Sequence, residues 1–199
     1  FSMNRSPFRY HHNPHKFSTY SLELGNCDFC SQKTPGYKGP FYGTNNVNFV
    51  CEECLIVGKL AERNAFTNEG DFGSLKKEIQ QKQPQLNESE IVRLAKIAND
   101  ELCHRTPHVV TWQDFLWPVH CADYCGFIKE AGKPDLLKIA PMDEVRLMFG
   151  SIDDENFKDW FETGIRPDSP NDNLIAYSIG VYLFQCLHCQ KYIVLWDTD

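Results

Sequence analysis

The chain has 199 residues, of which 42% are hydrophobic and 24% charged, and its 20 Lys and Arg against 27 Asp and Glu give a net charge of −7. This composition is typical of a globular protein with one domain or two small ones. No apolar run approaches the roughly 20 residues that span a bilayer, which excludes a membrane protein. The net negative charge argues against general binding of nucleic acid, because phosphate binding depends on clustered Lys and Arg. The most informative feature is the presence of nine cysteines.

Residues 1–26 are rich in Tyr, His, Phe and Pro and have no helical period, so we expect an extended arm. The arm contains no apolar stretch of the kind that forms a signal peptide, which predicts a cytoplasmic protein. Thiols stay reduced in the cytoplasm, so the cysteines are better interpreted as metal ligands than as disulfide partners. An odd number of cysteines also does not suit a fully paired disulfide framework.

Gly and Pro residues punctuate residues 27–54, and short β-prone runs lie between them. This pattern predicts small hairpins. Residues 52–66 have a helix-like pattern of apolar and charged positions. The polar stretch that follows predicts a loop with a short helix over 75–81.

The clearest helix signal begins at Asn87, which can cap a helix, with Glu90 three residues later. Apolar residues then recur at helical spacing up to Leu102. We expect this helix to end near Arg105, because Pro107 disfavours helix for the residue before it.

The last part of the sequence predicts short helices over 143–149 and 153–163 and β-strands over 174–184 and 191–196. The expected fold is therefore α+β: a small zinc-stabilised protein with an N-terminal zinc ribbon, a helical middle and C-terminal antiparallel strands. Two parts are expected within one integrated unit: an arm plus zinc-ribbon module over 1–66, and an α+β portion with a second Cys cluster over 67–199.

The zinc prediction depends on cysteine spacing. Three pairs have the CxxC form, a fourth pair is looser and one cysteine stands alone: Cys27/Cys30, Cys51/Cys54, Cys186/Cys189, Cys121/Cys125 and Cys103. Two CxxC turns can complete a tetrahedral Zn²⁺ shell, and the 20 residues between Cys30 and Cys51 fit a zinc ribbon. Ordinary buried thiols and a redox dithiol are the alternatives. A redox CxxC usually occurs singly, so the matched pair favours metal.

A second zinc site is expected from the two remaining pairs, Cys121/Cys125 and Cys186/Cys189, which gives two zinc ions per chain. The spacing of the first pair is less typical, and His120 or His188 could replace one thiolate. The alternative is that the first pair are buried thiols and that the last CxxC only shapes a turn.

Cys103 lies beside the apolar stripe of the helix that begins near Asn87, where a cysteine is usually a small core residue. A nucleophilic pair with His104 is disfavoured, because adjacent helical residues point in different directions. No phosphate-binding loop, nucleophile elbow or HExxH motif is present. The sequence therefore predicts no catalytic residue and no enzyme activity.

Charge is concentrated in residues 135–172, which contain ten acidic and four basic residues. An acidic face of this kind can attract a basic protein partner and accelerate association. The alternative is that these charges serve solubility alone.

Several motifs occur in an order that resembles the CbrC family, bacterial proteins with three CxxC motifs. They are Phe8-Arg9-Tyr10-His11-His12-Asn13-Pro14, Gly36-Tyr37-Lys38-Gly39-Pro40, Arg105-Thr106-Pro107, Trp112-Gln113, Trp117, His120-Cys121-x3-Cys125, Phe184-Gln185-Cys186-x2-Cys189 and Trp196-Asp197-Thr198-Asp199. The chain departs from the family at the second CxxC, where Glu52-Glu53 stands in place of Pro-Trp. The founding member is linked to tolerance of a nuclease colicin, so the resemblance implies a role in toxin tolerance.

The function expected from all of this is a cytoplasmic zinc-binding protein that acts as a protein-interaction or immunity-like toxin-tolerance factor. Its partner is expected to be a protein, with a basic toxin as one candidate. A nucleic-acid-binding zinc protein and a metal- or thiol-dependent enzyme are the alternatives.

Overall fold

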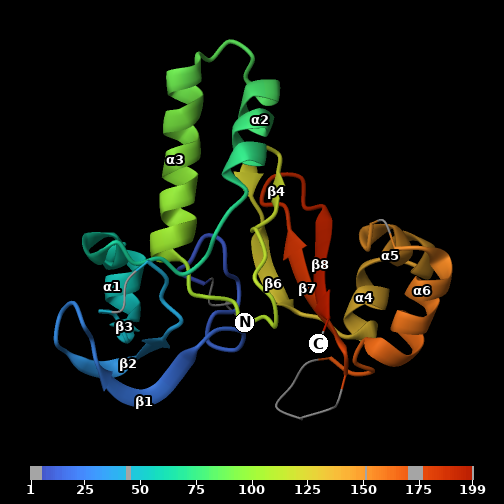
Figure 1. The fold of residues 1–199 in the computed structure, drawn as a ribbon, viewed down its shortest axis with the longest axis horizontal. Coiled ribbons are helices and arrows are strands. Elements are labelled where there is room, and N and C mark those ends of the chain that lie inside the picture. The colour runs from blue at the N-terminus through green and yellow to red at the C-terminus, as the bar shows by residue number, and fades with distance from the viewer. Residues whose placement is uncertain (1–5, 44–45, 151, 170–176, 199) are drawn as a thin grey trace, which may run out of the picture.

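The structure is a computed structural model that describes residues 6–43, 46–150, 152–169 and 177–198. Its N-terminal half begins with a small antiparallel sheet (Figure 1). We call this sheet and the short helix after it the ribbon. Its strands lie in the order β1-β2-β3, and its elements are β1 (Tyr20–Asn26), β2 (Lys33–Lys38), β3 (Phe49–Cys51) and α1 (Glu52–Ile56). A cluster of buried residues spanning Phe8 to Ala65 forms its core.

β2 contains Pro35 and Gly36, two of the Gly and Pro residues that punctuate the sequence between 27 and 54. Pro35 is accommodated because the pairing with β1 shifts between Ser21 and Gly25, so three residues of β1 bulge opposite it. Gly36 is required by close packing, because a Cβ there would lie 2.5 Å from the carbonyl oxygen of Val50. Both residues, which in a sequence usually mark the end of a strand, therefore lie within β2.

The helix expected over 52–66 is two short pieces, α1 and a 3-10 turn over Lys59–Arg63. Gly58 separates them with a φ of +77°, in the left-handed region that favours glycine.

A helical hairpin follows, made of α2 (Phe72–Lys82) and α3 (Glu88–Arg105) (Figure 1). The capping box between Asn87 and Glu90 is present in both directions, and α3 ends at Arg105 as the sequence predicts. α2 is longer than predicted, because the Asp71 side chain caps its first turn.

A second antiparallel sheet forms the centre of the molecule, in the order β6-β7-β8. Its strands are β6 (Gly126–Glu130), β7 (Ile179–Gln185) and β8 (Tyr192–Thr198), and a small hairpin of β4 (Val119–His120) and β5 (Asp123–Tyr124) precedes β6. The N-terminal arm runs along β6, where the Phe127 amide donates to the Tyr10 carbonyl at 2.8 Å. The arm thus covers one edge of this sheet.

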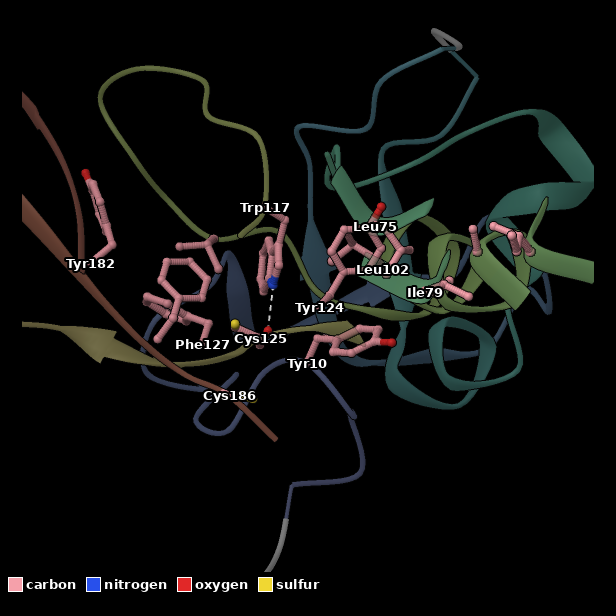
Figure 2. Packing of buried hydrophobic residues seen from close by; sticks show 14 residues of the cluster. Tyr10, Leu75, Ile79, Leu102, Trp117, Tyr124, Cys125, Phe127, Tyr182 and Cys186 are labelled. Carbon is pink, nitrogen blue, oxygen red and sulfur yellow. Dashed lines mark hydrogen bonds between the residues drawn. The ribbon is translucent and has the colours of Figure 1, made fainter. Parts of the chain in front are cut away.

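β7 is buried on both faces, and its alternating side chains belong to two different cores. Tyr182 and Phe184 pack with Trp117 in the first core, where the Trp117 indole donates to the Cys125 carbonyl at 2.7 Å (Figure 2). Val181 and Leu183 pack into the second core, under the helices that follow β6. One strand therefore joins the two halves of the hydrophobic interior.

The helices of the second core form a separate group beside the sheet (Figure 1), which we call the acidic lobe. It consists of α4 (Lys133–Ile139), α5 (Met142–Met148), α6 (Asp154–Asp159) and a π-helical turn over Trp160–Gly164.

The structure confirms the α+β class, with antiparallel C-terminal strands. The predicted strand over 174–184 is described from Ile179 onward, and residues 170–176 lie outside the described residues. In the described part of the chain, no helix is long and apolar enough to cross a membrane.

Candidate metal centres

The first candidate centre, here the ribbon site, lies where the three strands of the ribbon meet α1. Its four thiols are within 4.8 Å of one another: Cys27, Cys30, Cys51 and Cys54. Cys27 and Cys30 lie in the turn between β1 and β2, and Cys51 ends β3 and caps α1. The sequence predicts this set of four, and the fold brings its members together.

Distances in the ribbon site fit a tetrahedral ion. The Sγ atoms of Cys30 and Cys51 are 3.7 Å apart. Four sulfurs at about 2.3 Å from a zinc ion would be separated by about 3.8 Å. A disulfide would require about 2.05 Å, so the geometry is that of separate ligands around one point.

Backbone amides point at these sulfurs. The Cys51 amide donates to the Cys27 Sγ and the Cys54 amide donates to the Cys51 Sγ, each at 3.4 Å. Burial opposes ionisation of Cys27, but the amide donors outweigh it and lower the pKa of this thiol to about 7. The amides thus favour the thiolate of Cys27, whereas burial raises the pKa of the Cys51 and Cys54 thiols.

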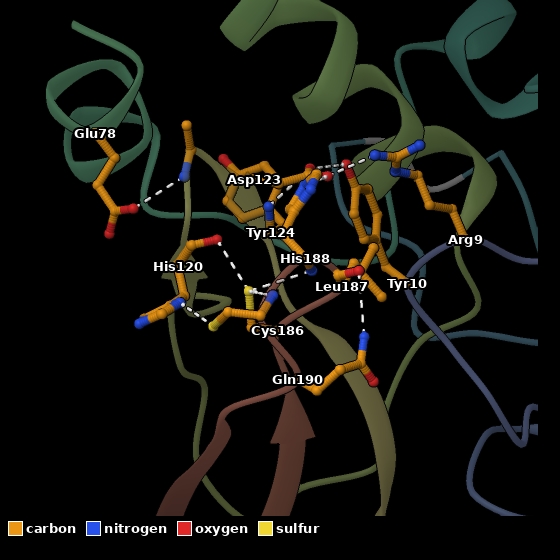
Figure 3. Close-up of polar contacts among 12 residues, drawn as sticks. Arg9, Tyr10, Glu78, His120, Asp123, Tyr124, Cys186, Leu187, His188 and Gln190 are labelled. Carbon is orange, nitrogen blue, oxygen red and sulfur yellow. Dashed lines mark hydrogen bonds and ion pairs between the residues drawn. The ribbon is translucent and has the colours of Figure 1, made fainter. Parts of the chain in front are cut away.

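The second candidate centre, here the second site, joins two segments far apart in the sequence (Figure 3). Its ligand atoms are also within 4.8 Å of one another and belong to His120, Cys121, Cys186 and Cys189. The first two lie at the tip of the β4–β5 hairpin, and the last two lie in the turn between β7 and β8. The His120 Nδ1 is 3.4 Å from the Cys189 Sγ.

The two CxxC turns that begin at Cys27 and Cys186 have the same local structure. Ser31 and Gln190 follow the second cysteine of each turn with φ of 60° and 64°. In both turns, the first cysteine's amide donates at 2.9 Å to a carbonyl five residues later. In the second turn, the Cys189 amide points at the Cys186 Sγ at 3.5 Å. The matched turns therefore present their sulfurs in the same way.

The structure corrects the expectation for Cys125. Its thiol lies outside the second site and is fully buried in the first core, where burial raises its pKa to about 12. His120, and not the predicted Cys125, is the fourth residue of this ligand group. The reason is the tight turn: Cys121 is at the tip, and β5 carries the chain away from the tip before Cys125 is reached.

The remaining candidates lie elsewhere. Cys103 is buried on α3, and burial raises its pKa to about 11, which agrees with the role of a small buried residue. His188, the other proposed substitute ligand, contacts Asp123 rather than the second site. His11 of the arm is fully buried and hydrogen-bonded to the backbone.

Asp123 is a buried carboxylate beside the second site, and no sequence motif marks it (Figure 3). It accepts hydrogen bonds from Arg9 at 2.5 Å and Tyr10 at 2.6 Å, and it lies 3.1 Å from the His188 Nε2. Glu78 of α2 holds the hairpin tip by accepting from the Ala122 amide at 2.9 Å. No spacing rule indicates these residues, because the fold brings them from four distant segments: the arm, α2, β5 and the turn between β7 and β8.

The donor sets identify the ions that each site suits. Four thiolates, or three thiolates with one imidazole, in tetrahedral arrangement are the ligands preferred by Zn²⁺. The structure therefore defines the class as an α+β protein with two groups of residues that could each bind a metal ion.

The chain belongs to the uncharacterised protein family UPF0167, which it matches over residues 6–198. It is 27% identical to a UPF0167 protein of Pseudomonas aeruginosa over 194 residues, which cover 92% of this chain and 90% of the relative. No solved structure matches the chain.

Proposed function

We propose that this protein binds two zinc ions and acts as a cytoplasmic interaction protein with a basic protein partner. The observation that supports zinc binding is the pair of four-ligand groups at the tips of hairpins. With three buried ligands in the ribbon site, the zinc there would be structural, since such sites contribute directly to folding energy. The cytoplasm suits nine cysteines without disulfides, because thiols persist in a reducing compartment.

The proposed interaction surface is the acidic lobe. Seven of its acidic side chains are exposed: Asp143, Glu144, Asp153, Asp154, Glu155, Asp159 and Glu162. Asp135 and Asp168 are not exposed and pair with Lys129 at 2.8 Å and with Arg166 at 3.1 Å, whereas Asp154 pairs with Arg146 at 2.8 Å but stays exposed. Asp172 lies outside the described residues. The exposed acids would steer a basic partner, and a basic toxin of the kind implied by the resemblance to the CbrC family has this chemistry.

Elemental analysis tests the metal part of the proposal. We expect two zinc ions per chain in protein purified under reducing conditions without chelators. One ion per chain would remove the second site from the proposal, and the absence of stoichiometric metal would contradict both sites.

Charge reversal tests the interaction part. Glu155 and Asp159 lie four residues apart on α6, so Glu155→Lys with Asp159→Lys reverses one exposed face. The matched control reverses two exposed residues away from the lobe, Glu23→Lys on β1 with Glu62→Lys in the 3-10 turn, and changes the net charge by the same amount. Immobilised wild type and control should retain the same basic host protein, whereas the lobe variant should not.

The purified partner should then associate more slowly as salt is raised, because the Debye length falls from about 10 Å at 0.1 M. A partner retained equally by the lobe variant, or a rate that does not change with salt, would contradict the proposed surface. Two zinc ions in all three proteins would show that the substitutions left the metal sites intact.

A further inference from the structure

A cavity of about 120 Å³ lies beside the chain that follows α3. Its lining comes from three segments: Tyr42 in the chain after β2, residues 66–69, and residues between 108 and 117 in the chain after α3. The metal ligands and the acidic lobe are not part of this lining. The cavity is therefore a feature separate from the proposed function.

Aromatic rings form the walls. Tyr42 and Phe66 face each other with ring centroids 5.5 Å apart, and their backbones pair through reciprocal hydrogen bonds. Phe115 and Trp117 stand 6.2 Å apart in the loop that leads to β4. Aromatic faces carry partial negative charge and attract cations within about 6 Å.

The polar groups in the lining are acceptors or acids. The His108 Nδ1 lies 2.9 Å from the Thr67 carbonyl, which only accepts, so Nδ1 carries the proton and Nε2 has a free lone pair. Burial lowers the pKa of this imidazole, which is therefore neutral at pH 7. The exposed carboxylates of Asp114 and Glu69 also line the cavity, and the Tyr42 hydroxyl donates to Asp114 at 3.5 Å. The residues that line the cavity include no Lys or Arg.

The floor is held by a buried hydrogen-bond network. The Asn68 amide donates to the carbonyls of Thr106 at 3.1 Å and Pro107 at 3.2 Å. The Thr67 hydroxyl donates to the Cys103 carbonyl at 3.1 Å. A cavity fixed in this way loses little conformational entropy when a ligand enters.

We propose that this cavity binds an organic cation, a guanidinium or ammonium group on an aliphatic stem, as found on arginine or lysine side chains. The walls supply aromatic faces, Asp114 and Glu69 supply negative charge, and the His108 Nε2 accepts a hydrogen bond. The cavity volume of about 120 Å³ allows one such headgroup to enter.

Three probes test the proposal: butylguanidinium, neutral butylurea of nearly the same shape, and the smaller cation butylammonium. Titration of the zinc-loaded full chain is followed by NMR, through the Trp117 indole and the His108 imidazole. We expect both cations to saturate with dissociation constants on the order of 1 mM, as suits ligands of this size. Butylurea should bind at least about tenfold more weakly, since it lacks the charge.

Asp114→Asn should weaken the cations about tenfold and leave butylurea unchanged, because it removes charge but keeps an acceptor for Tyr42. Asp143→Asn, an exposed acid of the acidic lobe, is the matched control and should change nothing. Equal affinity for the three probes, no saturation by either cation, or equal effects of the two substitutions would overturn the proposal. Even if a variant folds poorly, the comparison of the three probes on the wild-type protein still tests the proposal.

Discussion

Cys121 and Ala122 illustrate how single residues decide the composition of the second site. Both have positive φ, 59° and 63°, which makes a two-residue hairpin turn of the kind usually formed by Asn and Gly. Neither residue type favours this backbone, so sequence rules do not indicate the turn. With the turn in place, His120 lies beside Cys121 at the tip. The residue that could be predicted only as a substitute ligand therefore belongs to the site.

This arrangement makes a direct prediction about zinc content. His120→Ala should reduce the zinc from two ions per chain to one, because it removes a ligand of the second site. Cys125→Ala should leave two ions bound and reduce only packing in the first core. Elemental analysis of both variants decides the assignment, and a loss of zinc in Cys125→Ala alone would restore the spacing-based prediction.

His11 predicts a pH dependence of stability. Burial lowers its pKa from 6.5 to about 3, so the folded protein keeps it neutral while the unfolded chain takes up a proton below pH 6.5. Its contribution to stability is complete above the unfolded pKa and is lost as the pH falls. Between pH 7 and pH 5.5 this one group should remove about 1 kcal/mol from the free energy of unfolding.

Urea unfolding at the two pH values measures this effect. His11→Gln serves as the reference, because all other titrating groups, including those of the metal sites, are shared. The wild type should lose about 1 kcal/mol more than the variant over this range. Equal losses would mean that His11 is protonated in the folded protein.

At the scale of elements, α3 was predictable because its cap, its apolar spacing and Pro107 all agree. β6 and α4 were not. β6 has only five residues and begins with glycine, and its position is determined by pairing with β7, about fifty residues later. α4 offered a weak signal in Pro134, a residue favoured at helix starts. The ribbon site was predictable because its four cysteines lie within one local unit, whereas the second site depends on pairing between distant strands.

Gly36 and Gly73 provide a matched test of packing within elements. Gly36→Ala should destabilise the protein by about 1–3 kcal/mol, because the new Cβ would lie 2.5 Å from the Val50 carbonyl between β2 and β3. It should also loosen zinc at the ribbon site, since Cys51 ends β3. Gly73→Ala meets only an Asp71 oxygen at 3.6 Å and should be neutral or stabilising by about 0.5 kcal/mol. Thermal unfolding with zinc analysis measures both, and equal destabilisation by the two changes would contradict this packing.

At the scale of the whole molecule, the two centres differ in their access to solvent. The ribbon site has three buried cysteines and one exposed, Cys30. In the second site only Cys186 is buried, and Cys189 is exposed. A chelator reaches exposed ligands first, so the two ions should leave at different rates.

We therefore expect a chelating dye to remove zinc from the wild type in two phases of equal size. The fast phase should be absent from His120→Ala, which keeps only the ribbon site. A single phase with the same rate in both proteins would show that exposure does not govern release.

The distance along the chain between the two halves of the second site has a consequence for biosynthesis. The ribbon site is complete once residue 54 has left the ribosome, and segments made first generally fold first. The second site waits for Cys189, and the docking of Arg9 waits for Asp123. We expect metal to be loaded in a fixed order, first at the ribbon and then at the second site, which pulse-labelled nascent chains would reveal. The N-terminal arm would thus remain without its final partners for most of the time that the chain is being made.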